Sequence, residues 1–226
     1  MKFIKPILYF FLVISIPVLL VTSSIRLALS PIYINMEYSL PGFPDDPYGF
    51  STADRLVWAQ YSIDYLLGKI SHEELTRQTL PDGSPLYNER ELVHMLDVRN
   101  LTEVVLMIWR LTVIFFLLML ALAIRFHRIS DWQRAIRNGS KLTFLIVLAI
   151  LLYVALDFNR LFTQFHMLFF EGDSWLFHPS DHLIRLFPLR FWQDLFIFIG
   201  AIILIPAAAL AFYTGKKELN PFKDIF

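Results

Sequence analysis

Four long apolar segments constrain this chain of 226 residues more than any other feature. A helix needs about 20 mostly apolar residues to cross the hydrocarbon core of a bilayer. Each segment can reach that length, the first by extending to about Leu29 and the third by continuing toward Phe170. With 56% hydrophobic residues, the chain is more apolar than an ordinary soluble domain. The sequence therefore predicts an all-α integral membrane protein with four transmembrane helices, whose apolar segments lie at 6–21, 104–124, 142–156 and 191–213.

The first apolar segment has a second interpretation, as a cleaved signal peptide. Lys2 and Lys5 precede a short apolar core, which is typical of such peptides. No A-x-A cleavage site follows, because the chain continues as VTSSIRLALSP. We therefore favour a transmembrane helix, with the signal peptide as the alternative.

Basic residues next to the spans predict the orientation, because loops rich in Lys and Arg stay in the cytoplasm. The connection between spans two and three carries five of them: Arg125, Arg128, Arg134, Arg137 and Lys141. Lys2 and Lys5 precede the first span, and Lys216, Lys217 and Lys223 follow the last. Both termini are thus expected in the cytoplasm. The expected division is transmembrane helix 1 at 1–29, an extracytoplasmic segment at 30–103, transmembrane helix 2 at 104–124, a cytoplasmic loop at 125–141, transmembrane helix 3 at 142–170, an extracytoplasmic loop at 171–190, transmembrane helix 4 at 191–213 and a cytoplasmic tail at 214–226.

The extracytoplasmic segment 30–103 is too long for a simple loop. Its first part, 31–38, alternates weakly and predicts a short strand. A helix is predicted next, which Ser51 or Thr52 can cap and Gly68 can end. Its apolar residues recur at helical spacing: Leu56, Ala59, Ile63 and Leu66.

Two further helix starts follow in the same segment. Ser71 and Glu74 have the spacing of a capping box, in which each side chain bonds to the other residue's backbone N–H. Asn88, three residues before Glu91, can cap a helix from about Glu89 that bends or runs on into the second span. The outer segment is therefore predicted to be mostly helical.

Composition excludes several classes of function. The 20 basic and 20 acidic residues balance, so there is no basic surface for nucleic acid. The absence of cysteine excludes disulfides, thiolate metal sites and a cysteine nucleophile. No G-x-S-x-G, H-E-x-x-H, P-loop or dinucleotide fingerprint is present.

His166 stands out because it lies in the apolar stretch FTQFHMLFF, at the expected outer boundary of span three. Asn159 and Thr163 share its helical face, and Asp157 and Arg160 lie on a second polar face. Polar groups at membrane depth usually face a protein interior or a wet cavity. A helix emerging among lipid headgroups would explain the same pattern.

His94 and Arg110 are the next candidates along span two and its outer extension. On a helix, Asp97 shares the face of His94 and could fix the imidazole tautomer. A simple interfacial ion pair is the alternative. Arg110 lies inside span two, where it can pair with a carboxylate, such as Asp157 or Glu103, or with an anionic headgroup.

The loop 171–190 contains two more histidines and several aromatic residues. His178 and His182 are four apart, a spacing that suits a metal on a helix, but Pro179 disrupts the helix there. Trp175 and Phe177 fit an aromatic belt at the membrane interface. Without a third nearby ligand, no metal site and no cofactor are expected.

The chain resembles the lipoprotein intramolecular transacylases (Lit), a family of bacterial four-span membrane proteins. The resemblance rests on HMLDVR at 94–99, DFNRLFTQFHMLFF at 157–170, the following Trp175 and DHLIRLFP at 181–188. The motifs are short, but their order, spacing and topology agree over essentially the whole chain.

The resemblance implies transfer of the sn-2 acyl chain of an S-diacylglyceryl cysteine to the α-amine of the same cysteine. The family's two catalytic histidines map onto His94 and His166, an acid/base pair at the outer leaflet of the bacterial cytoplasmic membrane. Asp97, Arg110, Asp157, Asn159 and Arg160 are expected to support them. The expected partners are a diacylated lipoprotein and membrane lipid, and the oligomeric state stays open.

Three alternatives remain. The chain could be another acyltransferase or a lipid hydrolase at the membrane interface. His94, His166, His178 and His182 could instead bind a metal or haem in a protein without enzymatic activity. A purely structural membrane subunit is the third alternative.

Overall fold

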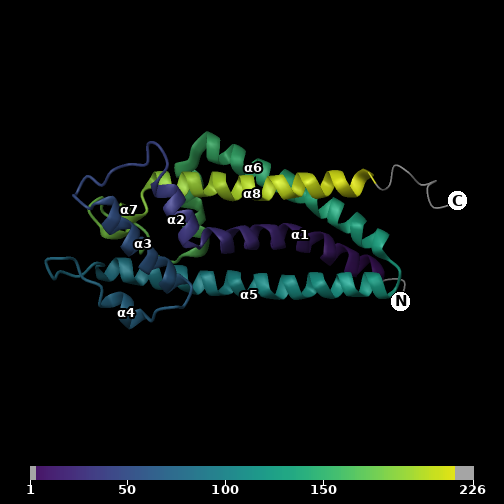
Figure 1. Cartoon of the computed structure of the whole chain (residues 1–226), viewed down its shortest axis with the longest axis horizontal. Helices are drawn as coiled ribbons and strands as arrows, with labels where there is room; N and C mark the ends of the chain where they lie inside the picture. The colour runs from purple at the N-terminus through teal and green to yellow at the C-terminus, as the bar shows by residue number, and fades with distance from the viewer. Residues whose placement is uncertain (1–3, 217–226) are drawn as a thin grey trace. The chain divides into compact units, whose positions relative to one another are not determined.

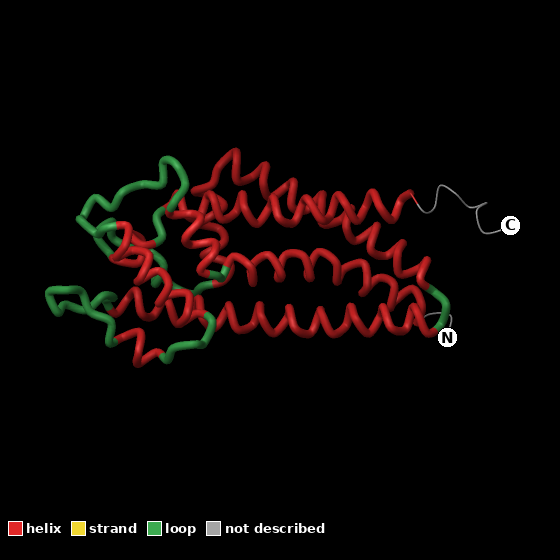
Figure 2. Tube along the Cα trace, in the orientation of Figure 1, coloured by secondary structure: helices red, strands yellow, loops and turns green. Residues whose placement is uncertain are grey.

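In this computed structural model, which describes residues 4–216, the chain forms eight α-helices (Figure 1). They are α1 Ile4–Ala28, α2 Pro31–Tyr38, α3 Thr52–Leu66, α4 His72–Thr76, α5 Glu89–Arg125, α6 Ile129–Phe169, α7 His182–Leu186 and α8 Leu189–Lys216. The described residues contain no strand, only one isolated bridge between Thr79 and Pro85 (Figure 2). Lys2, Lys217 and Lys223, used above for orientation, lie outside the described residues.

Four of these helices, α1, α5, α6 and α8, are long and apolar enough to cross a membrane. The predicted all-α fold with four such helices is confirmed. α5 runs unbroken from Glu89, so the outer amphipathic stretch and the second apolar segment form one helix. The expected loop 125–141 is mostly helical, since α6 begins at Ile129 and buries Ala135 and Ile136.

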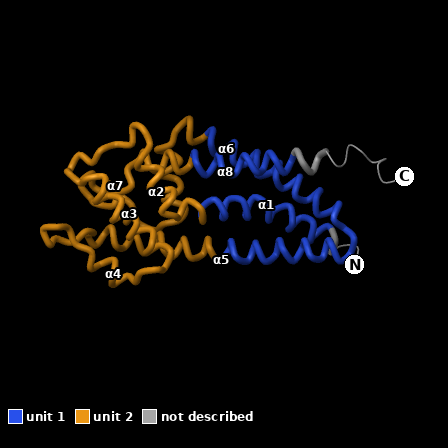
Figure 3. The backbone as a smooth tube through the Cα atoms, in the orientation of Figure 1, with its two compact units in different colours: residues 1–25, 107–152, 197–226 blue, residues 26–106, 153–196 orange. Residues whose placement is uncertain are grey.

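The chain divides into two compact units (Figure 3). Unit 1 comprises Met1–Ile25, Met107–Leu152 and Ile197–Phe226, and unit 2 comprises Arg26–Leu106 and Tyr153–Phe196. Unit 1 therefore holds most of the apolar helical segments, whereas unit 2 holds α2, α3, α4 and α7 with the adjoining ends of the long helices.

Small residues allow close helix packing within unit 1, as is common between membrane helices. A Cβ atom at Gly139 of α6 would lie 2.6 Å from the Ile16 side chain of α1, so only glycine fits there. A Cβ at Gly200 of α8 would lie 2.7 Å from Leu151 of α6.

The helix starts in unit 2 follow local sequence signals. Ser51 caps α3 and Ser71 caps α4, and both are capping boxes. Gly68 follows the end of α3 with a φ of 71°, a left-handed conformation that glycine adopts without steric cost. Asn88 and Glu91 bond to each other's backbone at the start of α5, in the same reciprocal arrangement. These four predictions are confirmed.

The predicted strand at 31–38 is wrong, because these residues form α2. Ser30 is its N-cap and Pro31 occupies the first turn, where proline is well tolerated. Tyr33, Ile34 and Glu37 are buried together with Tyr38. This spacing is that of one helical face, so the weak alternation misidentified the period.

α6 contains a break at Asp157, whose backbone is non-helical with φ −158° and ψ 82°. The Asp157 carboxylate accepts a hydrogen bond from the Arg160 backbone N–H at 3.0 Å, which is how an N-cap starts a new helix. The part of α6 that carries His166 is therefore a separately capped helical segment.

Candidate active site

Unit 2 brings His94 and His166 together from two helices. His94 lies in the second turn of α5, and His166 lies in the last turn of α6. Their ring centroids are 5.9 Å apart and the rings are nearly parallel, with an interplanar angle of 25°. Both are buried, with 6% and 8% of their surface exposed. The two histidines singled out from the sequence are thus neighbours in space.

Aromatic rings surround the pair. Phe170 contacts both imidazoles, at centroid distances of 5.0 Å from His94 and 5.5 Å from His166. Phe177 lies 5.3 Å from His94, and Trp175 lies 5.0 Å from His166. These contacts exclude water from much of the imidazole surface.

The two rings differ in their hydrogen bonds. Nδ1 of His166 lies 2.8 Å from the carbonyl oxygen of Phe162. A carbonyl only accepts, so Nδ1 carries the proton, and Nε2 of the neutral ring is then the acceptor. Nδ1 of His94 is buried without a hydrogen-bond partner among the described residues. The pair therefore contains one oriented ring and one ring with an unused polar atom.

Asp97 does not orient His94 in the way the spacing predicted. Its carboxylate accepts a hydrogen bond from the Ser174 hydroxyl at 3.2 Å, and it makes no hydrogen bond to the imidazole. The physical reason is that the loop after α6 presents a hydroxyl to the short Asp97 side chain. Asp97 thus contacts the loop that carries the aromatic rings.

The other candidate supporting residues are exposed, unlike the two buried imidazoles. Asp157 caps the second segment of α6, and Asn159 and Arg160 are exposed. Thr163 is also exposed, so the polar stripe leading to His166 does not continue into the buried pair. Arg110 is exposed and belongs to unit 1.

His178 and His182 form hydrogen bonds with residues other than His94 and His166. His178 is exposed and pairs with the Ser180 hydroxyl at 2.7 Å, while His182 hydrogen-bonds to the Leu86 carbonyl. Within residues 4–216, no three His, Asp or Glu side chains are grouped so that they could hold a metal ion.

The loop after α6 is held against the start of α5. The Arg90 guanidinium donates to the carbonyl oxygens of Asp173, at 3.2 Å, and Leu176, at 3.1 Å. With the Ser174 contact, this fixes the backbone on both sides of Trp175. The aromatic-belt interpretation did not predict that the Trp175 and Phe177 rings pack against the two histidines. Their position directly after the His166 helix was the only available signal.

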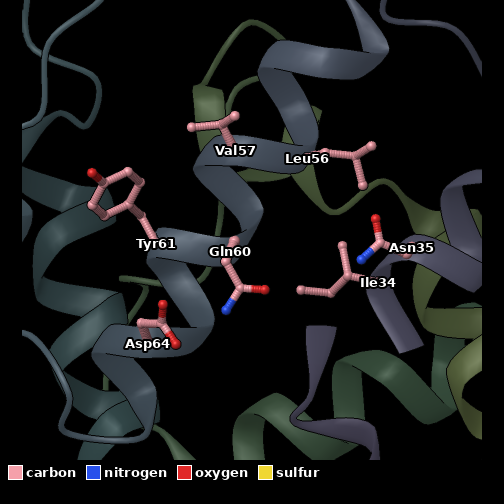
Figure 4. Close-up of a pocket in the computed structure, with 7 residues that line it drawn as sticks. All are labelled: Ile34, Asn35, Leu56, Val57, Gln60, Tyr61 and Asp64. Atoms are coloured by element: carbon pink, nitrogen blue, oxygen red, sulfur yellow. The ribbon is translucent and has the colours of Figure 1, made fainter. Parts of the chain in front are cut away.

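A groove of about 470 Å³ lies between α2 and α3 (Figure 4). Ile34 and Asn35 of α2 line one side, and α3 supplies the other with Leu56, Val57, Gln60, Tyr61 and Asp64. The lining is mostly apolar and includes neither histidine. The groove is therefore separate from the imidazole pair.

Unit 2 also contains a buried carboxyl group that the sequence did not reveal. Glu37 is 1% exposed, and its Oε2 accepts a hydrogen bond from the Tyr33 hydroxyl at 3.2 Å. Among the described residues Oε1 has no donor, and Asp194, which pairs with Arg190, is a charged neighbour of Glu37. Burial, and then the Asp194 carboxylate, raise the pKa of Glu37 to about 7.

At pH values above neutral, replacing Glu37 by glutamine is expected to raise the melting temperature. Because the folded-state pKa lies above the unfolded one, the stability that the protonated form contributes is complete at acidic pH and is lost as pH rises through about 7. Glutamine mimics the protonated form, donating to Asp194 and accepting from Tyr33.

Thermal unfolding in detergent at pH 5 and pH 8 measures this effect. The wild-type melting temperature should fall between these values by about 2–4 °C for each kcal/mol lost. Glu37→Gln should show a smaller fall. A variant that is equally or less stable than wild type at pH 8 would contradict the raised pKa of Glu37.

Comparisons with known proteins found a matching family model and a similar relative. Residues 10–192 match the family model described as lipoprotein intramolecular transacylase Lit. An uncharacterized protein of Aquifex aeolicus (strain VF5) is 32% identical over 219 residues, covering 92% of this chain and 94% of that protein.

Solved structures of the membrane integral lipoprotein intramolecular transacylase Lit from Bacillus cereus have the same fold. One matches with a TM-score of 0.72 at 18% identity, covering 96% of this chain and 99% of the other. A histidine-to-arginine variant of that protein matches with a TM-score of 0.65 at 18% identity, covering 96% and 94%.

Proposed function

The chain belongs to the lipoprotein intramolecular transacylase (Lit) family and is a multi-pass membrane acyltransferase, and we propose that His94 and His166 are its acid/base pair. The proposed substrate is a lipoprotein whose N-terminal cysteine carries an S-linked diacylglyceryl group. The sn-2 acyl chain moves from the glycerol oxygen to the α-amine of the same cysteine. The product is the lyso form, with an amide-linked chain and a free sn-2 hydroxyl.

One observation carries this proposal: two buried imidazoles from different helices lie with ring centroids 5.9 Å apart inside an aromatic shell. Imidazole is the side chain best suited to exchange protons near neutral pH. Two such rings at this separation can both reach one reacting centre. No nucleophile on the enzyme is needed, because the substrate supplies its own amine.

The proton balance of the reaction explains the need for two rings. An α-amine has a pKa of about 7.7–8.0 and is mostly an ammonium group at neutral pH. It must lose one proton before it attacks and a second as the carbon–nitrogen bond forms. One of these protons ends on the sn-2 oxygen when the carbon–oxygen bond breaks, and the other is released to water. Each imidazole can therefore accept one of these protons and later release it.

The hydrogen bonds favour a division of roles. Nδ1 of His166 is held by the Phe162 carbonyl, so its Nε2 is an oriented acceptor and suits the base that acts during attack. His94 is assigned the first proton of the ammonium, which it then passes to the leaving sn-2 oxygen. The remaining rate acceleration comes from positioning, because the acyl donor and the acceptor amine belong to one molecule.

The aromatic shell supports transfer over hydrolysis. Water competes with the amine for the ester, and rings that cover the imidazoles reduce its access. Phe170 touches both histidines and is the central member of this shell.

We also propose that both termini are cytoplasmic and that the site works at the outer leaflet, where a diacylated lipoprotein presents its ester. Asp97 supports the site through Ser174, and Arg110, Asp157, Asn159 and Arg160 are the other proposed supporting residues.

A reporter lipoprotein tests the proposed function. The chain is co-expressed with a diacylated reporter, and tandem mass spectrometry reads the reporter's N-terminal peptide. The expected peptide has an unchanged total mass, with one acyl chain moved from glycerol to the α-amine.

Other products would identify other reactions. An added acyl mass would mean an external donor, and a lost acyl mass would mean hydrolysis. An unmodified reporter, with the protein folded and inserted, would contradict the transfer. Metal analysis and an optical spectrum of the purified protein would then test the metal- and haem-binding alternatives.

A further inference from the structure

Trp175 has an unused hydrogen-bond donor beside the histidine pair. Its indole Nε1 is buried and has no hydrogen-bond partner among the described residues. Its ring lies 5.0 Å from the His166 ring, at an interplanar angle of 33°. An indole N–H can only donate, so its hydrogen-bond partner must be an acceptor.

Buried donors without a partner are uncommon in folded proteins, because removing them from water is unfavourable. Trp192 of unit 2 shows the usual arrangement, since its indole N–H donates to the Phe187 carbonyl at 3.1 Å. An unpartnered indole alone does not make a site, because Trp132 of unit 1 also has one. Trp175 differs because it contacts His166, and the neighbouring His94 ring carries a second buried unpartnered atom.

The position of Trp175 is fixed from both sides. Arg90 of α5 binds the carbonyl oxygens of Asp173 and Leu176, and Asp97 binds the Ser174 hydroxyl. The donor is therefore part of a loop anchored to the helix that carries His94. A preorganised donor of this kind stabilises developing charge without reorganising during the reaction.

We propose that the indole N–H of Trp175 donates a hydrogen bond to the carbonyl oxygen of the ester under attack and stabilises the oxyanion of the tetrahedral intermediate. This inference rests on the proposed acyl transfer. As the amine nitrogen bonds to the carbonyl carbon, the electron pair of the C=O π bond moves to oxygen, which faces the indole. When the bond to the sn-2 oxygen breaks, that pair returns to form the amide carbonyl. Trp175 keeps its proton throughout.

Trp175→Phe tests the proposal, because phenylalanine keeps an aromatic ring against His166 and lacks the N–H donor. We expect kcat to fall by about 10²–10³-fold, the usual effect of losing one oxyanion donor. KM should change little, because the ground-state carbonyl carries little charge. Trp192→Phe is the matched control: it removes an indole N–H that is already satisfied, so kcat should stay near wild type.

A second measurement uses the unmodified protein. A lipopeptide with a phosphonate in place of the sn-2 ester mimics the oxyanion. Its binding should move the Trp175 indole N–H signal downfield in a ¹⁵N NMR spectrum, and Trp175→Phe should bind it more weakly by a factor similar to the loss in kcat. This readout does not depend on turnover.

The outcomes separate the two proposals. Wild-type kcat in Trp175→Phe, or an indole signal that the phosphonate leaves unchanged, would overturn the role of Trp175 while acyl transfer stands. A wild-type protein that moves no acyl chain on the reporter would instead overturn the proposed function. If Trp175→Phe does not fold, the NMR measurement decides.

Discussion

Replacing either His94 or His166 by glutamine is expected to lower the rate of acyl transfer by about 10²–10⁴-fold, the usual contribution of a general acid or base. Glutamine stays polar and bulky but cannot take or give the proton. The measurement is single-turnover transfer on a purified diacylated lipopeptide, followed by mass spectrometry. Because the two rings act on one reaction, the double variant should lose little more than either single variant.

His178→Gln is the matched control for these variants. His178 is exposed, and among the described residues its hydrogen bonds stay within its own loop, with Ser180 and Asp181. Its substitution should leave the transfer rate unchanged. Near wild-type turnover in His94→Gln or His166→Gln, with normal folding, would show that the imidazole pair is not the acid/base machinery.

Among the substitutions proposed for this protein, loss of the Asp46 carboxylate is expected to lower the free energy of unfolding most. Asp46 lies in the loop between α2 and α3, and its fully buried side chain makes a bidentate ion pair with Arg185 of α7. The Arg185 side chain is 7% exposed. The guanidinium also lies over the Phe50 ring, 3.4 Å from its centroid. Asp46→Ala leaves this buried charge unpaired, which costs about 3–5 kcal/mol. Thermal unfolding in detergent should show a melting temperature lower by about 2–4 °C for each kcal/mol.

Two controls identify the cause of this loss. In Asp46→Leu/Arg185→Met both charges are replaced by apolar groups, so most of the stability should return. Glu73→Ala removes the exposed ion pair with Arg77 and should leave the melting temperature unchanged. An Asp46→Ala protein as stable as wild type would mean that Arg185 finds another partner or water.

Local features of the fold were predictable because they depend on residues near each other in the sequence. The four apolar helices follow from hydropathy alone, and the starts of α3, α4 and α5 follow from short side chains that bond to the next turn. α2 was misidentified because eight residues with mixed burial match two periods about equally well. The break at Asp157 was also not predicted, since the signal there is a single side chain that bonds to a backbone N–H three residues on.

The candidate site was only partly predictable. His94 and His166 stood out as polar residues in apolar surroundings, but nothing local in the sequence sets the distance between residues on two different helices. Asp97 was assigned to His94 from helical spacing, whereas the folded loop gives it Ser174 as its partner. The sequence predicts a membrane-interface position for Trp175, and tertiary packing brings its ring against His166.

The sequence by itself determined the number of apolar helices, most of their ends and the two histidines that carry the proposed chemistry, because hydropathy and capping act over one or two helical turns. Tertiary structure alone decided that these histidines are stacked neighbours, that Glu37 is buried beside Asp194, and that Asp46 pairs with a guanidinium 139 positions away. Such contacts join side chains from distant segments. Their geometry is set when the helices pack against one another, and no local pattern records it.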